Sequence, residues 1–252
     1  MTQSHKRPVP VMTDILFTFN NLLWLVFAVV ALSLTVLVFR LFGREGLYAL
    51  VVGALVIANI QVTKTVVLFG LTATLGNVLY GTVFLATDVL TEVYGVKEAR
   101  RCVWLGLVVV VLMVLWMQFA LWFRPGPQDL ASGALSTIFG LIPRVAAGSL
   151  IAYIVSQHHD ITAFSFWRRK TGGRMLWVRN CASTMVSQAI DTVLFCFIAL
   201  WGLYDVTTWL QILATTYLLK WGVALLDTPF MYLAVHVGSR WRSGPTTDST
   251  VH

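Results

Sequence analysis

Long hydrophobic stretches recur along almost the whole chain, and they limit the fold more than any other feature of the sequence. Seven can be marked in the 252 residues, centred near Val30, Val56, Phe84, Val110, Ala147, Thr192 and Gly222. A helix needs about 20 apolar residues to cross a bilayer, so the chain has room for six or seven spans joined by short loops. The sequence therefore predicts an all-α integral membrane protein.

The composition agrees with a chain that lies in lipid. Hydrophobic residues make up 58% of the sequence and charged residues 12%, whereas soluble domains contain about 25% charged residues. The net charge of +7 is spread over the segments between hydrophobic stretches, where membrane topology explains it better than nucleic-acid binding does. We expect a lipid bilayer as partner, and no nucleic acid and no cofactor.

The chain is predicted to have three parts. Residues 1–21 form a polar N-terminal segment, 22–238 a transmembrane bundle with a six-helix core at about 47–238, and 239–252 a cytoplasmic tail. The first hydrophobic stretch is longer than the roughly 7–15 apolar residues of a secretory signal. We therefore expect it to remain as one additional N-terminal transmembrane helix.

Lysine and arginine residues predict the orientation of the bundle. With seven spans, one side receives twelve of them: Arg40, Arg44, Lys97, Arg100, Arg101, Arg168, Arg169, Lys170, Arg174, Arg179, Arg240 and Arg242. The other side receives Lys6, Arg7 and Arg124, and the spans contain Lys64, Arg144 and Lys220. The positive-inside rule then puts the C-terminus in the cytoplasm and the N-terminus outside the inner membrane.

Charged and amide side chains inside five spans mark a candidate interior site, because a charge at the bilayer centre costs about 2.5–3.5 kcal/mol. Asp88 and Glu92 are four residues apart and share a helix face. Lys220 and Asp227 share a face of the last span. The sixth span carries a polar stripe, with Gln188 on its flank, formed by Asn180, Thr184, Ser187 and Asp191.

Structural roles remain open for several of these residues. Asp88 and Glu92 could lie at a helix end and pair with Lys97 or Arg100 in the adjoining loop. Lys64 could snorkel to a membrane surface, and Asn180 could cap a helix. Arg144 and Lys220 could be counter-ions of the carboxylates. A metal at His158, His159 and Asp160 is disfavoured, because adjacent helical residues point about 100° apart, and we expect no metal site.

Three segments carry a resemblance to a known family. They are ATDVLTEVYGVKEARR at 86–101, RVAAGSLIAYIVSQHHD at 144–160 and TGGRMLWVRNCASTMVSQAIDTVLFCFIA at 171–199. The chain resembles the queuosine-precursor transporter family, also called the VUT family, over roughly Tyr48 to Gly238. The positions that match the shared motifs are Asp88, Glu92, Arg144, Gln157, Asp160, Ser183, Thr184, Asp191 and Lys220.

The resemblance implies an inner-membrane importer of 7-deazaguanines such as 7-cyano-7-deazaguanine, for synthesis of the tRNA base queuosine. It implies a six-helix core similar to the substrate-binding subunits of energy-coupling-factor transporters. Docking to an energising ATPase module and homo-oligomerisation stay open, because the chain has no Walker motif of its own. The additional first span departs from the family pattern.

The predicted substrate-binding set combines the interior residues with this resemblance. It consists of Asn59, Asp88, Glu92, Arg144, Gln157, Asn180, Gln188, Asp191 and Lys220. Tyr80, Trp177 and Tyr217 are candidates for stacking on a flat ring. The alternatives are a transporter for another vitamin-like heterocycle, a structural assembly protein and a membrane-embedded enzyme. The enzyme is least favoured, since no GxSxG or HExxH motif occurs, and we predict that the chain is not an enzyme.

Overall fold

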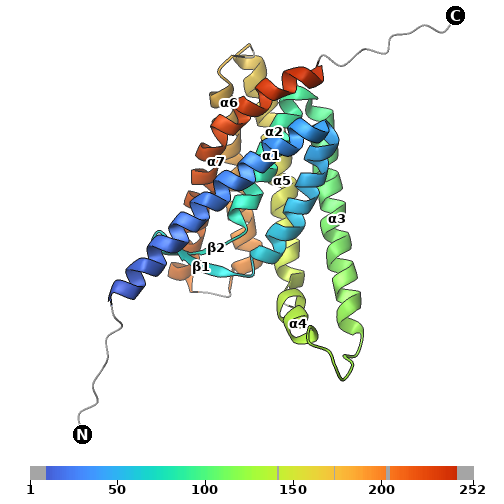
Figure 1. Cartoon of the computed structure of the whole chain (residues 1–252), viewed down its shortest axis with the longest axis vertical. Helices are drawn as coiled ribbons and strands as arrows, with labels where there is room; N and C mark the ends of the chain where they lie inside the picture. The colour runs from blue at the N-terminus through green and yellow to red at the C-terminus, as the bar shows by residue number, and fades with distance from the viewer. Residues whose placement is uncertain (1–9, 141, 173, 203–204, 243–252) are drawn as a thin grey trace, which may run out of the picture.

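Helices form nearly all of the computed structural model, which describes residues 10–140, 142–172, 174–202 and 205–242. The order is α1 (Pro10–Gln61), β1 (Thr65–Leu68), β2 (Leu71–Thr74), α2 (Asn77–Val93), α3 (Val96–Trp122), α4 (Ser132–Gly140), α5 (Ile142–Lys170), α6 (Leu176–Phe195), the π-helix η1 (Cys196–Leu200) and α7 (Val206–Arg242). The long helices stand side by side in one bundle (Figure 1). The predicted helical membrane fold is thus confirmed at this level.

Helix α1 contains two of the predicted hydrophobic stretches, separated by a sharp break at Gly43. This glycine has φ 59° and ψ −135°, a conformation that a residue without a Cβ adopts readily. The chain therefore runs up one side of the bundle and turns back beside it (Figure 1). In the first half, Trp24, Leu32 and Phe39 are buried, whereas Leu22 is 60% exposed, as expected of a helix with one face in lipid.

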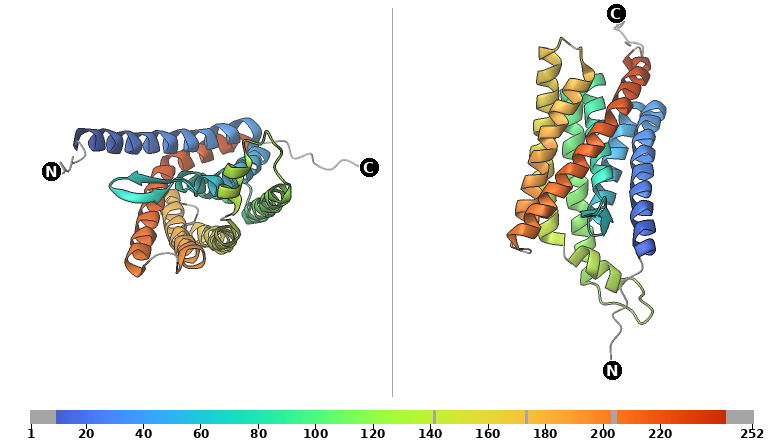
Figure 2. Two further views of the ribbon diagram at one scale, coloured as in Figure 1. Left: turned by 90° about the horizontal axis from the view of Figure 1, so that it is seen from below. Right: turned by 90° about the vertical axis from the view of Figure 1, so that its left-hand side faces the viewer.

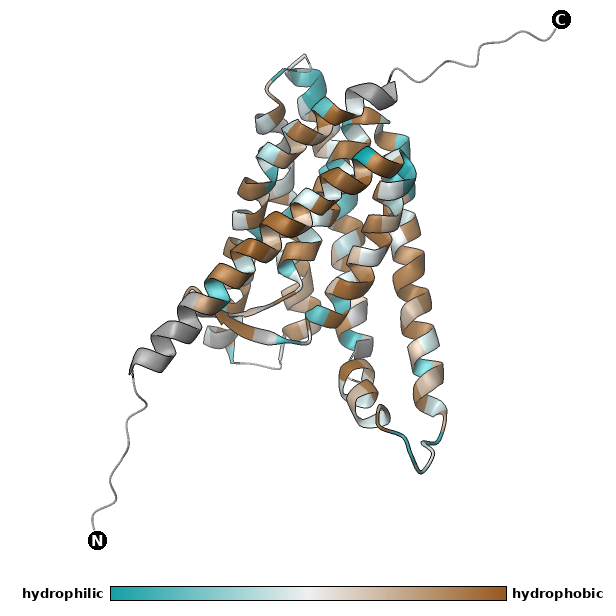
Figure 3. Cartoon of the chain, viewed as in Figure 1, coloured by the Kyte–Doolittle hydropathy of each residue, from teal (hydrophilic) through white to brown (hydrophobic). Residues whose placement is uncertain are grey.

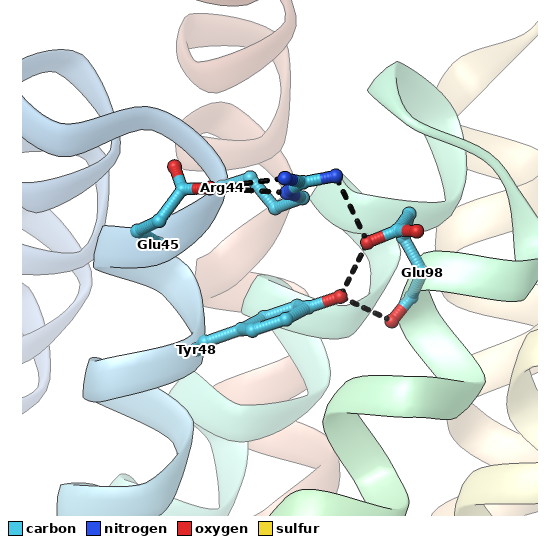
Figure 4. A network of polar contacts seen from close by, with 4 residues as sticks. All are labelled: Arg44, Glu45, Tyr48 and Glu98. Carbon is cyan, nitrogen blue, oxygen red and sulfur yellow. Dashed lines mark hydrogen bonds and ion pairs between the residues drawn. The ribbon is translucent and has the colours of Figure 1, made fainter.

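A network of polar side chains fastens the break in α1 to the start of α3 (Figure 4). The Tyr48 hydroxyl donates to Glu98 Oε2 at 2.6 Å, and Arg44 Nη1 lies 3.3 Å from the same oxygen. Arg44 also pairs with Glu45. Because these charges are partly exposed, each ion pair contributes about 1 kcal/mol or less.

A β-hairpin after α1 was not predicted. Thr65–Leu68 pairs antiparallel with Leu71–Thr74, and the two-residue turn has positive φ at both Phe69 (51°) and Gly70 (80°), as a tight hairpin turn requires. The hairpin lies between α1 and α7 (Figure 2), where Phe69 N–H donates to Asn21 Oδ1 at 2.8 Å. Its short apolar run reads as part of a helix, although β-branched residues followed by a Phe-Gly turn favour strands.

Four helical segments are long and apolar enough to cross a membrane by length and composition: Phe19–Gln61, Val96–Trp122, Cys181–Leu200 and Trp209–Gly238. Seven separate spans were predicted, and two of these fall within the first segment. The predicted spans in α2 and α5 are not among the four, because α2 has only 17 residues and polar side chains lower the hydropathy of α5. The polar side chains of both helices are largely buried, so α2 and α5 lie in the centre of the bundle.

The two ends of the bundle differ in their lysine and arginine residues, because Arg44, Lys97, Arg100, Arg168 and Arg174 lie in segments that meet at one end. The break in α1, the connection from α2 to α3, the α5–α6 turn and the C-terminal end of α7 lie at this end (Figure 1). Hydrophilic residues gather there, and hydrophobic ones cover the middle of the helices (Figure 3). The start of α1, the hairpin and the α3–α4 loop lie at the opposite end. We call these the basic end and the hairpin end.

Small residues bring some helices into close contact. A Cβ added at Gly81 would lie 2.2 Å from Val223 Cγ1, so α2 touches α7 there, and one added at Gly148 would lie 3.1 Å from Ala199 Cβ. Gly148 and Ala152 form a small-residue pair on α5, of the kind that lets helices pack closely. At these two contacts the neighbouring helices lie close together.

Candidate functional site

A pocket lies in the half of the bundle nearer the hairpin end. The space inside it, counted with its opening, is about 340 Å³. Its lining comes from the end of α1 and from α2, α5, α6 and α7: Val62, Asn77, Tyr80, Ser149, Ala152, Asp191, Phe195, Thr216 and Lys220. Polar and aromatic groups thus meet in one small space.

A buried ion pair forms part of the pocket wall. Lys220 Nζ on α7 contacts Asp191 Oδ2 on α6, and the two residues are each 4% exposed. Ser156 Oγ on α5 donates to the other carboxyl oxygen of Asp191 at 3.2 Å. An ion pair taken out of water needs such additional hydrogen bonds to be tolerated. The pair therefore offers an acceptor and a donor side by side at the pocket.

Tyr80 supplies the aromatic face of the pocket. Its ring lies 5.5 Å from Lys220 Nζ, measured to the ring centroid, which is within the range of a cation–π contact. Asn59 and Ser149 are its polar neighbours. Tyr80 was one of three predicted stacking candidates, and it is the one that lines the pocket. Asn59, a predicted site residue, reaches the pocket only through Tyr80.

Two carboxyl groups lie deeper in the bundle, toward the basic end. Asp88 on α2 and Asp160 on α5 are both 0% exposed and lie within interaction distance of each other. Thr184 Oγ1 donates to Asp88 Oδ2 at 3.2 Å, and Asp227 on α7 is the next carboxyl group near Asp88. We call Asp88 and Asp160 the carboxyl pair.

Buried amides fill the space between the pocket and the carboxyl pair. Gln157 Oε1 accepts a hydrogen bond from Thr87 Oγ1 at 3.1 Å, which ties α5 to α2 beside Asp88. Gln188 is 1% exposed on α6. Both were predicted site residues. Neither the Gln157 amide nitrogen nor the Gln188 amide group has a hydrogen-bond partner within the part of the chain described here, so both could bind a ligand or water.

Glu92 does not pair with Asp88 as its spacing suggested. It faces Arg168 near the end of α5, with a 3.5 Å separation between Oε2 and Nε, and Arg168 also donates to the Thr91 carbonyl at 3.3 Å. The alternative of a pairing with a basic residue at the helix end is therefore correct in kind, although the partner is Arg168 rather than Lys97 or Arg100. This contact joins α2 to α5 at the basic end.

Arg144 lies apart from the other predicted residues. Its guanidinium is exposed and donates from Nε to the Ile198 carbonyl at 2.9 Å and from Nη2 to the Trp201 carbonyl. These carbonyls end the α6–η1 helix and lack helical donors of their own. Arg144 therefore caps a helix end. Lys64 is likewise exposed, after the end of α1.

Several site residues escaped the sequence analysis. Asn77, Ser149, Ser156 and Thr216 are buried on or beside the pocket wall, but single Ser, Thr and Asn residues in apolar helices carry no distinctive pattern. The side chain of Asn180, which was predicted, lies outside the described residues. Among the described residues, no group of three or more His, Cys, Asp or Glu side chains is placed to hold a metal ion.

Comparison with known proteins identifies the family. A family model described as "Putative vitamin uptake transporter" matches residues 74–234. A protein of Bacillus subtilis (strain 168), named "Probable queuosine precursor transporter", is 48% identical over 217 residues, which cover 86% of this chain and 95% of that protein. The chain belongs to the queuosine precursor transporter family.

A more distant relative agrees with this assignment. The "Queuosine precursor transporter" of Escherichia coli (strain K12) is 28% identical over 166 residues, covering 65% of this chain and 72% of that protein. No solved structure matches the chain. The predicted family is confirmed, and with it a multi-pass membrane transporter rather than an enzyme. The pocket is therefore the candidate substrate-binding site of this transporter.

Proposed function

We propose that this transporter imports a 7-deazaguanine precursor of queuosine, such as 7-cyano-7-deazaguanine, and binds it in the pocket at Asp191 and Lys220. One observation carries the proposal: a buried carboxylate and a buried ammonium stand together on the wall of the pocket. Family membership supports the substrate class, since the relatives are named for queuosine precursors.

The hydrogen-bonding edge of a guanine-like ring matches this pair. The ring nitrogen and the exocyclic amine present two N–H donors that a carboxylate accepts as a bidentate pair. The adjacent ring carbonyl needs a donor, which an ammonium supplies. Asp191 would accept hydrogen bonds from the N–H groups, and Lys220 would donate to the carbonyl, when this edge of the substrate contacts both side chains. The pocket could then hold the flat ring against Tyr80.

The position of the pocket fits uptake from outside. Twelve lysine and arginine residues fall at the basic end in the predicted topology, which favours a cytoplasmic location of that end and of the C-terminus. The N-terminus and the hairpin end then face outside the inner membrane. The pocket lies in the outer half, and the Glu92–Arg168 contact lies at the cytoplasmic end. A substrate would enter from outside and leave when that contact opens, as alternating access requires.

The helices after Gly43 would form the six-helix core of the proposal. These are the second half of α1 and helices α2, α3, α5, α6 and α7, and the first half of α1 is the additional N-terminal helix. We propose that this core is similar to the substrate-binding subunits of energy-coupling-factor transporters. The first half of α1 covers one side of it (Figure 2).

Rescue of queuosine in tRNA tests the proposed function. The chain is expressed in a bacterium that cannot make queuosine precursors and lacks its own importer, with limiting 7-cyano-7-deazaguanine in the medium. We expect queuosine to reappear in tRNA with the wild-type chain and not with Asp191→Asn. If the wild-type chain reaches the membrane and no 7-deazaguanine precursor restores queuosine, the proposed substrate is wrong.

A second candidate substrate is another vitamin-like heterocycle, which the description of the matching family favours. Such a ligand would need an adjacent donor and acceptor to bind Asp191 and Lys220. It would not need the particular arrangement of N–H and carbonyl groups on the edge of guanine. Competition separates the two candidates: guanine-like compounds should reduce the rescue at equal concentration, while heterocycles without an N–H donor pair should not. The reverse order of inhibition would favour the second candidate.

A further inference from the structure

The carboxyl pair is not explained by substrate binding in the pocket. Asp88 and Asp160 come from different helices, are fully buried and approach each other in the bundle interior. Neither lines the pocket. A separate reason is therefore needed for two acids at this depth.

Three of the four carboxyl oxygens of the pair have no hydrogen-bond donor among the described residues. Asp88 Oδ1 and both carboxyl oxygens of Asp160 have no hydrogen-bond partner within the described residues. Three hydroxyl groups lie around Asp160, those of Ser183, Thr184 and Ser187, but Thr184 donates to Asp88 and Ser187 donates to the Ser183 carbonyl at 2.8 Å. Buried acceptors without donors are costly, so these oxygens need a donor that the described side chains do not provide.

The charged groups around the pair do not supply a described counter-ion. Asp227 approaches from α7 and adds a third acid near Asp88. Lys220 on the same helix contacts Asp191 instead. His159, next to Asp160, has Nδ1 2.9 Å from Ser187 Oγ. Glu92, one turn beyond Asp88, faces Arg168. The nearby basic side chains are thus engaged elsewhere among the described residues.

A proton would satisfy this arrangement. Two carboxylates at close range in a low dielectric cannot both stay charged, and they hold one proton between them. A carboxylic O–H on one acid then donates to an oxygen of the other and provides the missing donor. A metal ion fits less well, because no group of three or more ligands is placed to hold one within the described part of the chain.

We propose that Asp88 and Asp160 form the proton site of a proton-coupled importer, taking up one proton from outside and releasing it to the cytoplasm with each substrate. This inference rests on the proposed function and adds its energy source. The proton forms an O–H bond on one carboxyl group, which breaks again when water on the cytoplasmic side reaches the pair. No other reactant takes part.

The same helices link this proton site to the pocket. On α5, Ser156 contacts Asp191 at the pocket, and Asp160 lies one turn further along. On α6, Asp191 lines the pocket, and Thr184 contacts Asp88 two turns away. A movement of α5 against α6 that opens or closes the pocket therefore also changes the surroundings of the pair, as coupled transport requires.

Purified protein in liposomes tests the inference. Counterflow exchange of radiolabelled 7-cyano-7-deazaguanine without a gradient measures transport alone. A pH lower by one unit outside, with the membrane potential clamped at zero, measures coupling. One proton per substrate should give about tenfold accumulation, since one pH unit equals 1.36 kcal/mol. A pH dye trapped inside should report acidification that depends on substrate.

One variant and one control locate the site. We expect Asp160→Asn to retain counterflow and lose the gradient-driven accumulation. Asp129→Asn makes the same chemical change in the exposed α3–α4 loop and should keep both activities. The inference is overturned if the wild type exchanges substrate but neither accumulates it nor acidifies the lumen, or if Asp160→Asn accumulates it as the wild type does. Absence of counterflow in the wild type would overturn the proposed function itself.

Discussion

The pocket and the carboxyl pair both contain buried aspartates, but the surroundings of these aspartates differ. In the pocket, the Asp191 carboxylate contacts the Lys220 ammonium and accepts a hydrogen bond from Ser156. In the carboxyl pair, the Asp160 oxygens have no donor within the described residues and face a second acid. Both sites are almost completely buried, so burial alone does not determine the state of an acid in this bundle.

The difference supports the two functions proposed for these sites. A charged acid beside its counter-ion can exchange that partner for the donors of a substrate. An acid beside another acid can exchange a proton instead. The two sites share α5 and α6 but have separate chemistry, so substitutions should separate binding from energy coupling.

The largest effect on stability is expected at the pocket. Asp191→Asn removes the partner of a buried ammonium, which costs about 3–5 kcal/mol when one member of a buried pair is lost. The double variant Asp191→Asn with Lys220→Met removes the orphaned charge and should regain most of that stability without regaining transport. Free energies of unfolding in bicelles measure both. Equal losses in the single and double variants would show that the ion pair does not stabilise the fold.

A smaller effect is expected at the helix contact between the two sites. Gly81 lies on α2 between Tyr80 and Asp88, and an added Cβ would overlap Val223 on α7. Gly81→Ala should destabilise the bundle by about 1–3 kcal/mol, as overpacking does, and reduce transport by pushing α2 from α7. Gly222→Ala is the control, because nothing lies within 4 Å of its added Cβ. Similar unfolding free energies for the two variants would rule out a tight contact here.

A still smaller effect is expected at the carboxyl pair. If the pair already holds a proton, Asn replaces a neutral acid of the same shape, and Asp160→Asn should change the unfolding free energy by less than about 1 kcal/mol, within the range of most mild substitutions. This contrasts with Asp191→Asn, although both are the same chemical change. A loss at Asp160 as large as that at Asp191 would mean that Asp160 is ionised and paired.

The smallest effect concerns an acid in water, which serves as a reference for the two buried sites. Asp129 accepts hydrogen bonds from the backbone N–H groups of Ala131 and Ser132 at 2.7 and 2.9 Å. Hydrogen bonds from Ser132 and then Ala131 lower the pKa of Asp129 below its ordinary value. The ionised carboxylate therefore stabilises the turn fully at pH values above its ordinary pKa of about 3.9. This stabilisation is lost as the pH falls below that value and the carboxylate becomes protonated.

Hydrogen exchange across pH measures this capping. Protection of the Ala131 and Ser132 amides, after correction for intrinsic exchange rates, should persist at pH 5 and decline below about pH 3.9. In Asp129→Asn the protection should show no such decline. A wild-type profile that is flat over this range would mean that the carboxylate does not cap the turn.

The sequence predicts which residues are buried better than it predicts their partners. The stripe of Thr184, Ser187 and Asp191 is buried, as its helical spacing indicates. The spacing also puts Asp88 and Glu92 on one face, yet Asp88 meets Asp160 while Glu92 meets Arg168. Helical periodicity fixes the direction of a side chain on its own helix, but not which helix packs against it.

Lys220 and Asp227 illustrate the same limit. They share a face of α7, but two helical turns separate them by about 10 Å. Lys220 therefore reaches the pocket, whereas Asp227 reaches Asp88. Arg144 was predicted to lie in the interior because it falls in a hydrophobic stretch. In the structure it lies near the start of α5 and donates to the Ile198 carbonyl. The depth of a residue depends on helix boundaries, which hydropathy fixes only to within a few residues.

Direct binding of 7-cyano-7-deazaguanine to the purified transporter tests the central claim, that Asp191 and Lys220 recognise the substrate. Calorimetry in nanodiscs would compare the wild type with Asp191→Asn and the loop control Asp129→Asn. We expect a saturable heat for the wild type and the control, and a Kd at least tenfold higher for Asp191→Asn, equivalent to about 1.4 kcal/mol or more. An unchanged Kd in a folded Asp191→Asn protein would place the substrate elsewhere and contradict the account.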